Sequence, residues 1–253
     1  SGEDEALFVL AIKERQTEDA ITACLSLELT ATAQPAGVPD PSGPFAAFAA
    51  PPAMAAPVPG QTFEVRARLA NRGRLAVAPA EITLEAATGW TATATGPADI
   101  AATVAAHDQL ARRFSVAVAA DAPLSTRPYF RRSGLQESRY TLDDPASFGR
   151  AASAPPLVAV ARYVVEGSPV TVREVVRRRE AKLPYGDVLR EVRSVPRLAV
   201  TVSPAAAVIP LASASKRVEL TVDLVHNAEE ATSGAVTLTV PAGWSVVPPQ
   251  QPF

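Results

Sequence analysis

Residue types that build many enzyme active sites are scarce in this chain. It has one cysteine, Cys24, and two histidines, His107 and His226, among 253 residues. A single cysteine excludes an intrachain disulfide framework. A zinc site needs three or four converging ligands, and the sequence has neither an H-x-x-H nor a C-x-x-C motif. No G-x-S-x-G motif supports a serine nucleophile. We therefore expect no enzymatic activity, no catalytic residue, no metal ligand and no cofactor in this chain.

Long apolar runs and an excess of positive charge are also missing. No apolar stretch approaches the roughly 20 residues of a membrane-spanning helix, so none is expected. The formal net charge is −2, which does not favour nucleic acid as a partner. The sequence begins with Ser1-Gly2 rather than methionine and shows no signal peptide, so we expect a fragment of a longer protein.

Alternation of apolar and polar residues dominates what remains and predicts a mainly β fold. The exception is a helix expected over residues 3–23, where apolar residues recur every three or four positions. Seven strands between residues 25 and 177 predict an immunoglobulin-like β-sandwich. They are expected at 25–32, 63–69, 81–86, 90–95, 110–118, 157–165 and 170–176. The expected core comprises Phe63, Val65, Leu69, Ile82, Leu84, Phe114, Val116 and Val118.

A sequence repeat predicts a second sandwich of the same kind. Ile82-Thr83-Leu84 followed by Gly89-Trp90 matches Val236-Thr237-Leu238 followed by Gly243-Trp244. Expected strands near 198–202, 218–224 and 236–240 give only part of a sandwich. The predicted organisation is a helix at 1–24 that ends a preceding domain, a sandwich at 25–179, a linker at 180–196 and a partial second sandwich at 197–253. The first sandwich carries insertions at 34–60 and 123–155.

The first insertion is rich in alanine and proline and is expected at the surface, held by Phe45 and Phe48. The second concentrates aromatic and arginine residues within 126–150. Such side chains are enriched at interfaces, which makes this segment a candidate docking surface between domains or against a partner. The alternative is a long crossover that packs on its own sandwich. The candidate docking residues are Arg127, Tyr129, Phe130, Arg131 and Tyr140.

Three further features have both a functional and a structural interpretation. Trp90 and Trp244 could stack on sugars, but their equivalent places after glycine favour a shared structural role. Asp143 and Asp144 could form a carboxylate pair, yet neighbours on an extended chain point apart, which favours a turn before Pro145. The basic triplet 177–179 is typical of a solvated strand end.

Several of these segments resemble large bacterial deacetylases of the PIG-L/LmbE-like family, in the region that follows the catalytic domain. The resemblance rests on Lys13-Glu14-Arg15-Gln16 before Leu25-Ser26-Leu27-Glu28, on Arg127-Pro128-Tyr129-Phe130 with Asp143-Asp144-Pro145, on Pro156-Leu157-Val158-Ala159, and on Arg190-Glu191-Val192-Arg193 with Val195-Pro196. The run from Asn227 to Pro241-Ala242-Gly243-Trp244 resembles the NEW-type sandwich module found beside glycoside-processing domains.

The family's catalytic domains are zinc-dependent de-N-acetylases of N-acetylglucosaminyl groups, with a P-D-D and an H-x-x-H signature. Neither occurs here, since Leu142 precedes Asp143-Asp144. The resemblance therefore implies a non-catalytic accessory region that positions or supports a preceding catalytic domain, in an exported protein. The alternative is an independent carbohydrate-binding or cell-surface module. Expected partners are that catalytic domain, glycans, or a second copy of the chain.

Overall fold

The computed structural model describes residues 2–39, 43–44, 52–96, 102–134, 136–210, 212 and 216–253. The chain forms two compact units, unit 1 (Ser1–Val195) and unit 2 (Pro196–Phe253), and each is described by itself. The described residues are mainly β with one α-helix, as the sequence pattern predicts.

Unit 1 contains the helix and the larger set of strands. Its elements are α1 (Gly2–Cys24), β1 (Leu27–Pro35), β2 (Thr62–Asn71), β3 (Val77–Ala86), β4 (Trp90–Thr95), β5 (Ala102–Val104), β6 (Gln109–Val118), β7 (Phe130–Arg131), β8 (Thr141–Leu142), the short 3-10 helix η2 (Pro145–Ser147), β9 (Leu157–Val165), β10 (Ser168–Val175), β11 (Arg177–Ala181) and β12 (Asp187–Glu191). Strands β1, β2, β3, β4, β6, β9 and β10 correspond to the seven expected from the alternation.

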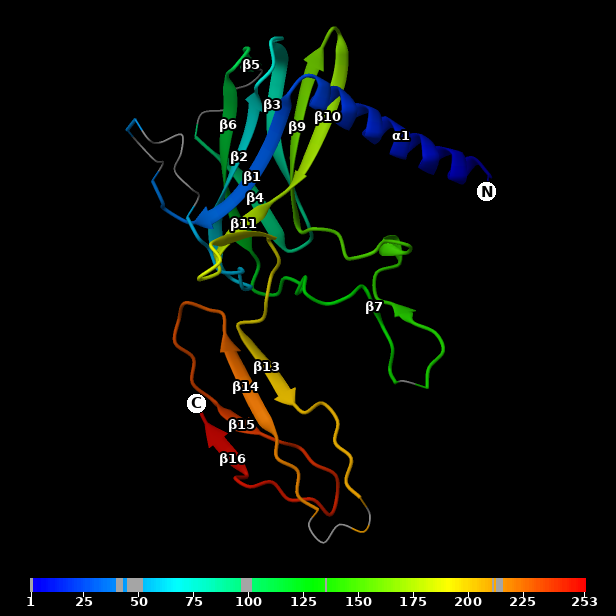
Figure 1. Ribbon diagram of the computed structural model, residues 1–253, viewed down its shortest axis with the longest axis vertical. Coiled ribbons are helices and arrows are strands. Elements are labelled where there is room, and N and C mark those ends of the chain that lie inside the picture. The colour runs from blue at the N-terminus through cyan, green and yellow to red at the C-terminus, as the bar shows by residue number, and fades with distance from the viewer. Residues whose placement is uncertain are drawn as a thin grey trace. The chain divides into compact units, whose positions relative to one another are not determined.

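These strands form a β-sandwich (Figure 1). One sheet has the order β12-β11-β1-β2-β6-β4 and the other has the order β10-β9-β3-β5. β1 pairs antiparallel with β2 and parallel with β11, where Thr32 lies opposite Arg177. The β9–β10 hairpin turns at Glu166-Gly167, as its glycine-containing loop predicts.

Inward-facing side chains of both sheets make one hydrophobic core. In the larger sheet Phe63 lies opposite Val116 and Val65 lies opposite Phe114, and all four are buried. In the smaller sheet the fully buried Ile82 lies opposite Ala161. Every expected core residue is buried except Leu84, which is half-buried and packs against the core. The alternation therefore assigned the inner face correctly.

The segment expected as a linker at 180–196 belongs to the larger sheet instead. Residues 177–181 pair with 187–191, so Arg179 lies opposite Leu189, and the boundary between the units falls after Val195. Val192 and Ser194 are buried. The sequence did not reveal these strands because they are built from charged residues. Ion pairs join them, among them Arg190 of β12 to Glu180 of β11 at 3.0 Å.

The alanine- and proline-rich insertion is also less superficial than expected. Ala53 bridges to Arg179, and the side chains of Met54 and Val58 are buried. The nearly buried Arg178 donates from Nη1 to the carbonyl of Met54 at 3.0 Å, which fixes this segment beside β11. Phe45 and Phe48, which were expected to hold the insertion, lie outside the described residues.

Unit 2 consists of two small antiparallel ladders. β13 (Leu198–Ser203) pairs with β14 (Thr221–His226), and β15 (Ala235–Thr237) pairs with β16 (Gln250–Pro252). Large apolar side chains stay exposed in this unit, including Val200 at 59% and Val225 at 55%. The described part of unit 2 therefore presents strands without a closed core.

Candidate functional site

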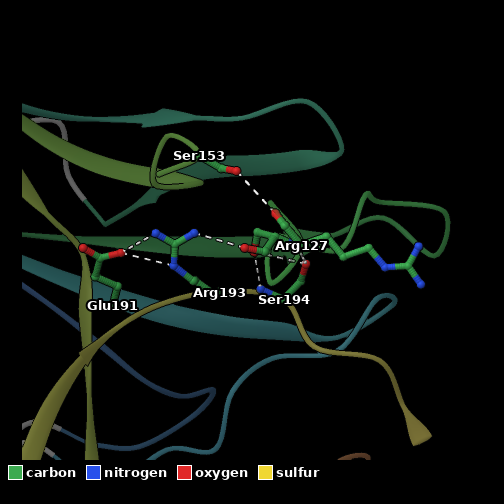
Figure 2. Close-up of polar contacts among 6 residues, drawn as sticks. Arg127, Ser153, Glu191, Arg193 and Ser194 are labelled. Atoms are coloured by element: carbon green, nitrogen blue, oxygen red, sulfur yellow. Dashed lines mark hydrogen bonds and ion pairs between the residues drawn. The ribbon is translucent and has the colours of Figure 1, made fainter. Parts of the chain in front are cut away.

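The aromatic insertion, residues 126–150, starts from a hydrogen-bonded clasp at its base. Ser194 is fully buried, and its Oγ donates to the carbonyl of Pro123 at 3.0 Å. The backbone N–H of Ser194 donates to Ser125 Oγ at 2.7 Å, and the N–H of Ser125 donates to Ser194 Oγ at 3.2 Å. Figure 2 shows the Arg193 guanidinium beside the Glu191 carboxylate, and its Nη1 also donates to the carbonyl of Ser125 at 3.0 Å. The root of the insertion is therefore fixed to the end of unit 1.

Beyond the clasp, the insertion folds on itself rather than on the sandwich. Phe130 and Arg131 of β7 pair with Leu142 and Thr141 of β8. Phe130 contacts Tyr129 and Tyr140 edge to face, with ring centroids 5.1 and 5.2 Å apart. The Tyr129 hydroxyl donates to the carbonyl of Arg150 at 2.7 Å. Aromatic and backbone contacts thus give this small segment its own local structure.

Several charged groups of the insertion have partners within it. Arg131 forms an ion pair with Asp143 at 2.8 Å, and the Arg132 guanidinium lies 5.3 Å from the Tyr140 ring centroid. Asp144 accepts a hydrogen bond from Ser147 Oγ at 2.6 Å, just before the turn of η2. Asp143 and Asp144 therefore have separate structural partners. This arrangement favours the turn interpretation over an acid–base pair.

The five candidate docking residues lie in this insertion and differ in exposure. Figure 2 shows the Arg127 side chain extending away from the clasp, while its carbonyl accepts from Ser153 Oγ at 3.3 Å. Tyr140 is 58% exposed and Phe130 is 36% exposed. Phe148, which was not among the candidates, is the most exposed of these aromatics at 78%. The insertion thus presents an aromatic and arginine surface to solvent.

The two tryptophans of the repeat have different environments. Trp90 is buried, and its ring packs edge to face on Phe63 with centroids 6.1 Å apart. Its faces are therefore not available to stack on a sugar. Trp244 is 48% exposed and keeps an accessible ring. Trp90 and Trp244 therefore share the glycine-containing turn before them, as expected from a common structural role. They do not share the same packing, because only Trp90 is buried.

Helix α1 is anchored at one end only. Thr22 Oγ1 and the Tyr163 hydroxyl lie 2.8 Å apart in the interior, and Glu18 accepts the backbone N–H of Thr171 at 2.8 Å. Burial raises the pKa of Tyr163, and the hydrogen bond with Thr22 partly opposes this shift. Figure 1 shows the helix leaving the sandwich beside β10, with its N-terminus far from either sheet of unit 1.

The free half of α1 is a feature that the sequence pattern did not predict. Its large apolar side chains are all 40% or more exposed, namely Leu7, Phe8, Val9, Leu10 and Ile12. Five such residues in a run of six point to every side of a helix, because successive residues are rotated by about 100°. A helix that is apolar all round is normally buried. The run is visible in the sequence, but only its three- and four-residue spacing enters the prediction, as evidence for a helix.

The two histidines belong to different units. His107 lies between β5 and β6 in unit 1, and His226 ends β14 in unit 2, where its ring contacts Thr232 Oγ1 at 3.0 Å. Across the described ranges, no three His, Cys, Asp or Glu side chains gather in a way that could hold a metal ion. No helix of the described part combines the length and apolarity needed to cross a membrane.

Comparison with known proteins gives one match. Residues 58–129 match the family model of the NPCBM-associated, NEW3 domain of alpha-galactosidase. No curated protein and no solved structure matches the chain. The matched segment runs from just before β2 to the start of the aromatic insertion, so it covers the first copy of the repeat. The match supports an accessory, carbohydrate-related β domain that accompanies glycosidases.

Proposed function

We propose that this chain is a non-catalytic accessory region that positions or supports a catalytic domain acting on amino sugars. The NEW3 match over residues 58–129 supports the accessory role. Asp143 and Asp144 each have a structural partner, Arg131 and Ser147 respectively, so the proposal assigns them no chemical role.

The single observation that carries the docking part of this proposal is the exposed apolar half of α1. Its base is fixed to Tyr163 and Thr171, so the free half projects in a defined direction. Leaving five large apolar side chains in water costs free energy that docking recovers, at about 25 cal/mol per Å² of apolar surface buried. A groove in another folded domain encloses more sides of a helix than a flat surface does. We assign α1 as the element that seats unit 1 on its catalytic partner.

The proposed partner is a zinc-dependent de-N-acetylase domain of the PIG-L/LmbE-like kind. The sequence resemblance supports this choice, and it places α1 at the junction between the catalytic and accessory parts. Export of the whole protein is part of the proposal, because accessory domains of glycosidases commonly work outside the cell. The aromatic insertion provides a second contact surface, with Tyr140 and Phe148 as its most exposed rings.

Two experiments test this function. The gene sequence upstream of Ser1 should encode a P-D-D and H-x-x-H domain in the same reading frame. When the chain and that domain are purified separately and mixed, they should bind each other. The double substitution Phe8→Ser and Leu10→Ser in the chain should abolish this binding. Lys13→Ala is the matched control on the same helix, since Lys13 contacts only Gln16 by its side chain among the described residues. Unchanged binding of the double variant would refute docking through α1.

Trp244 favours a second candidate function, an independent carbohydrate-binding module. Its ring is 48% exposed, whereas Trp90 is buried. Sugars stack on exposed aromatic faces in many binding modules, so a glycan array should show binding that Trp244→Ala removes if this candidate is correct. Loss of binding in Trp90→Phe alone would point to damage of the fold rather than to a sugar platform.

A further inference from the structure

A cavity of about 540 Å³ lies where three parts of unit 1 meet. Arg15 of α1 borders it on one side, Arg150 and residues 154–156 at the end of the aromatic insertion on another, and the strand ends of β3 and β10 on a third. This volume is in the range of small-molecule sites, roughly 300–1,000 Å³. The cavity is therefore large enough for a compact ligand.

Positive charge gathers in this cavity although the chain as a whole is slightly acidic. Arg15, Arg150 and Arg173 all line it, with Glu85 as the one acidic lining residue. Glu85 is engaged by Arg173, whose Nη1 lies 2.5 Å from Glu85 Oε2. Arg15 and Arg150 form no ion pair with any residue in the described part of the chain. Two guanidinium groups without an ion-pair partner among the described residues thus border one cavity.

A neighbouring cavity of about 310 Å³ helps to decide where an anion would bind. It shares Arg15 and Arg173 and is also lined by Glu14, Glu18 and Asp19 of α1. Glu18 is occupied by the backbone N–H of Thr171. These carboxylates repel an anion from the smaller cavity, so an anionic group is favoured in the larger one, beside Arg150.

The rest of the lining limits the chemistry of the ligand. Pro155, Pro156, Val158 and Val175 supply an apolar wall, and no aromatic ring lines the cavity. Such a wall contacts C–H groups without offering a stacking platform. Arginine rather than lysine provides all the positive charge, and its planar fork suits carboxylate geometry.

We propose that this cavity binds an acidic saccharide through the carboxylate of a uronic acid, held between Arg15 and Arg150. The assignment of the ligand class rests on the proposed carbohydrate-related function, while the preference for an anion rests on the cavity itself. Arg173 is kept in place by Glu85 and borders the ring of the sugar. The lining of the site does not include the exposed apolar side chains of α1.

The test is calorimetric titration of the full chain with trigalacturonate, with neutral galactotriose and with sodium sulfate. Trigalacturonate should bind at one site, at least about tenfold more tightly than galactotriose, because only the acidic sugar pairs with the arginines. The double substitution Arg15→Gln and Arg150→Gln should weaken binding at least about tenfold, which corresponds to a loss of about 1.4 kcal/mol. Arg74→Gln, an exposed arginine outside the cavity, should leave it unchanged.

Three results would overturn the proposal. They are absence of trigalacturonate binding, equal binding of both trisaccharides, and unchanged binding in the double variant when circular dichroism shows an intact fold. Sulfate that displaces trigalacturonate at equal concentration would show a site for an adventitious ion only. None of these results bears on docking through α1, because the Phe8 and Leu10 variant tests that step with a different readout.

Discussion

The two copies of the repeat share a turn but differ in what packs on it. In unit 1 the N–H of Trp90 donates to the carbonyl of Ala87 at 3.0 Å, and in unit 2 the N–H of Trp244 donates to the carbonyl of Pro241 at 3.2 Å. Gly89 and Gly243 precede them with φ of 80° and 89°, a conformation that favours glycine. The local sequence thus determines the same turn twice.

Burial around the turn differs because of distant strands. Trp90 of β4 packs on Phe63 of β2, and β6 lies between these two strands and pairs with both. A Cβ added at Gly89 would lie 2.9 Å from the Cβ of Ala122, whereas nothing lies within 4 Å of one at Gly243. The comparison shows that local hydrogen bonds give a turn its shape, while partners from elsewhere in the chain give it stability.

The largest expected difference between the units concerns the two tryptophans. Trp90→Ala should lower the free energy of unfolding of unit 1 by about 3–5 kcal/mol, because a large buried ring leaves a cavity. Trp244→Ala should cost unit 2 about 1 kcal/mol or less, as expected for a half-exposed side chain. Urea titrations followed by the amide signals of β2 and β6, and of β13 and β14, measure each unit separately. Equal losses would remove the distinction between the two copies.

A smaller difference is expected for the asparagines of the repeat. Asn71 is 1% exposed; its Nδ2 donates to the carbonyls of Leu75 and Val104, and its Oδ1 accepts the N–H of Gly73. Asn227 is half-buried, and its Nδ2 donates to the carbonyl of Pro196 at 2.9 Å. Asn71→Ala should therefore destabilise unit 1 by about 2–3 kcal/mol and Asn227→Ala unit 2 by about 1 kcal/mol. The same titrations measure both, and a larger loss in unit 2 would contradict the comparison.

The smallest expected difference appears at alkaline pH. Burial raises the pKa of Tyr163 above its ordinary value of 10.0, so the folded unit 1 keeps a proton that the unfolded chain releases. The contribution of Tyr163 to the stability of unit 1 should be fully present below pH 10 and should be lost as the pH rises through the raised pKa. Unit 2 contains no tyrosine.

The measurement is urea unfolding of unit 1 at pH 8, 9.5 and 11, followed by Trp90 fluorescence in a Trp244→Phe background. Tyr163→Phe is the matched control and should remove the part of the pH dependence that this hydroxyl causes. If the dependence persists undiminished in that variant, another group is responsible.

Alternation in the sequence predicted the sandwich well because inward residues such as Phe63, Val116 and Ile82 repeat at every second position. It could not reveal β11 and β12, which are joined by ion pairs from Arg179 to Asp187 and from Arg190 to Glu180. The hydrogen bond from Arg178 is also the main reason that the pKa of Glu180 is lowered. Charged strands have the same composition as a solvated loop, so only their neighbours distinguish them.

The candidate site was predictable in composition but not in geometry. Clustering of Tyr129, Phe130 and Tyr140 marked the insertion, yet no sequence pattern indicates that these rings pack on one another. The clasp between Ser125 and Ser194 joins residues far apart in the chain, and serine is too common to signal it. The arginine-lined cavity likewise collects Arg15, Arg150 and Arg173 from three elements. Only the tertiary fold brings such groups together.

The clasp also determines when the insertion can mature during protein synthesis. Ser125 must wait for Ser194, which is added 69 residues later. At about 5–20 residues per second, this delay is about 3–14 s, apart from the time that the exit tunnel adds. During that interval the exposed rings of the insertion have no fixed root, and β1 still lacks its parallel neighbour β11. The nascent sandwich therefore depends on its last strands to secure a segment made much earlier.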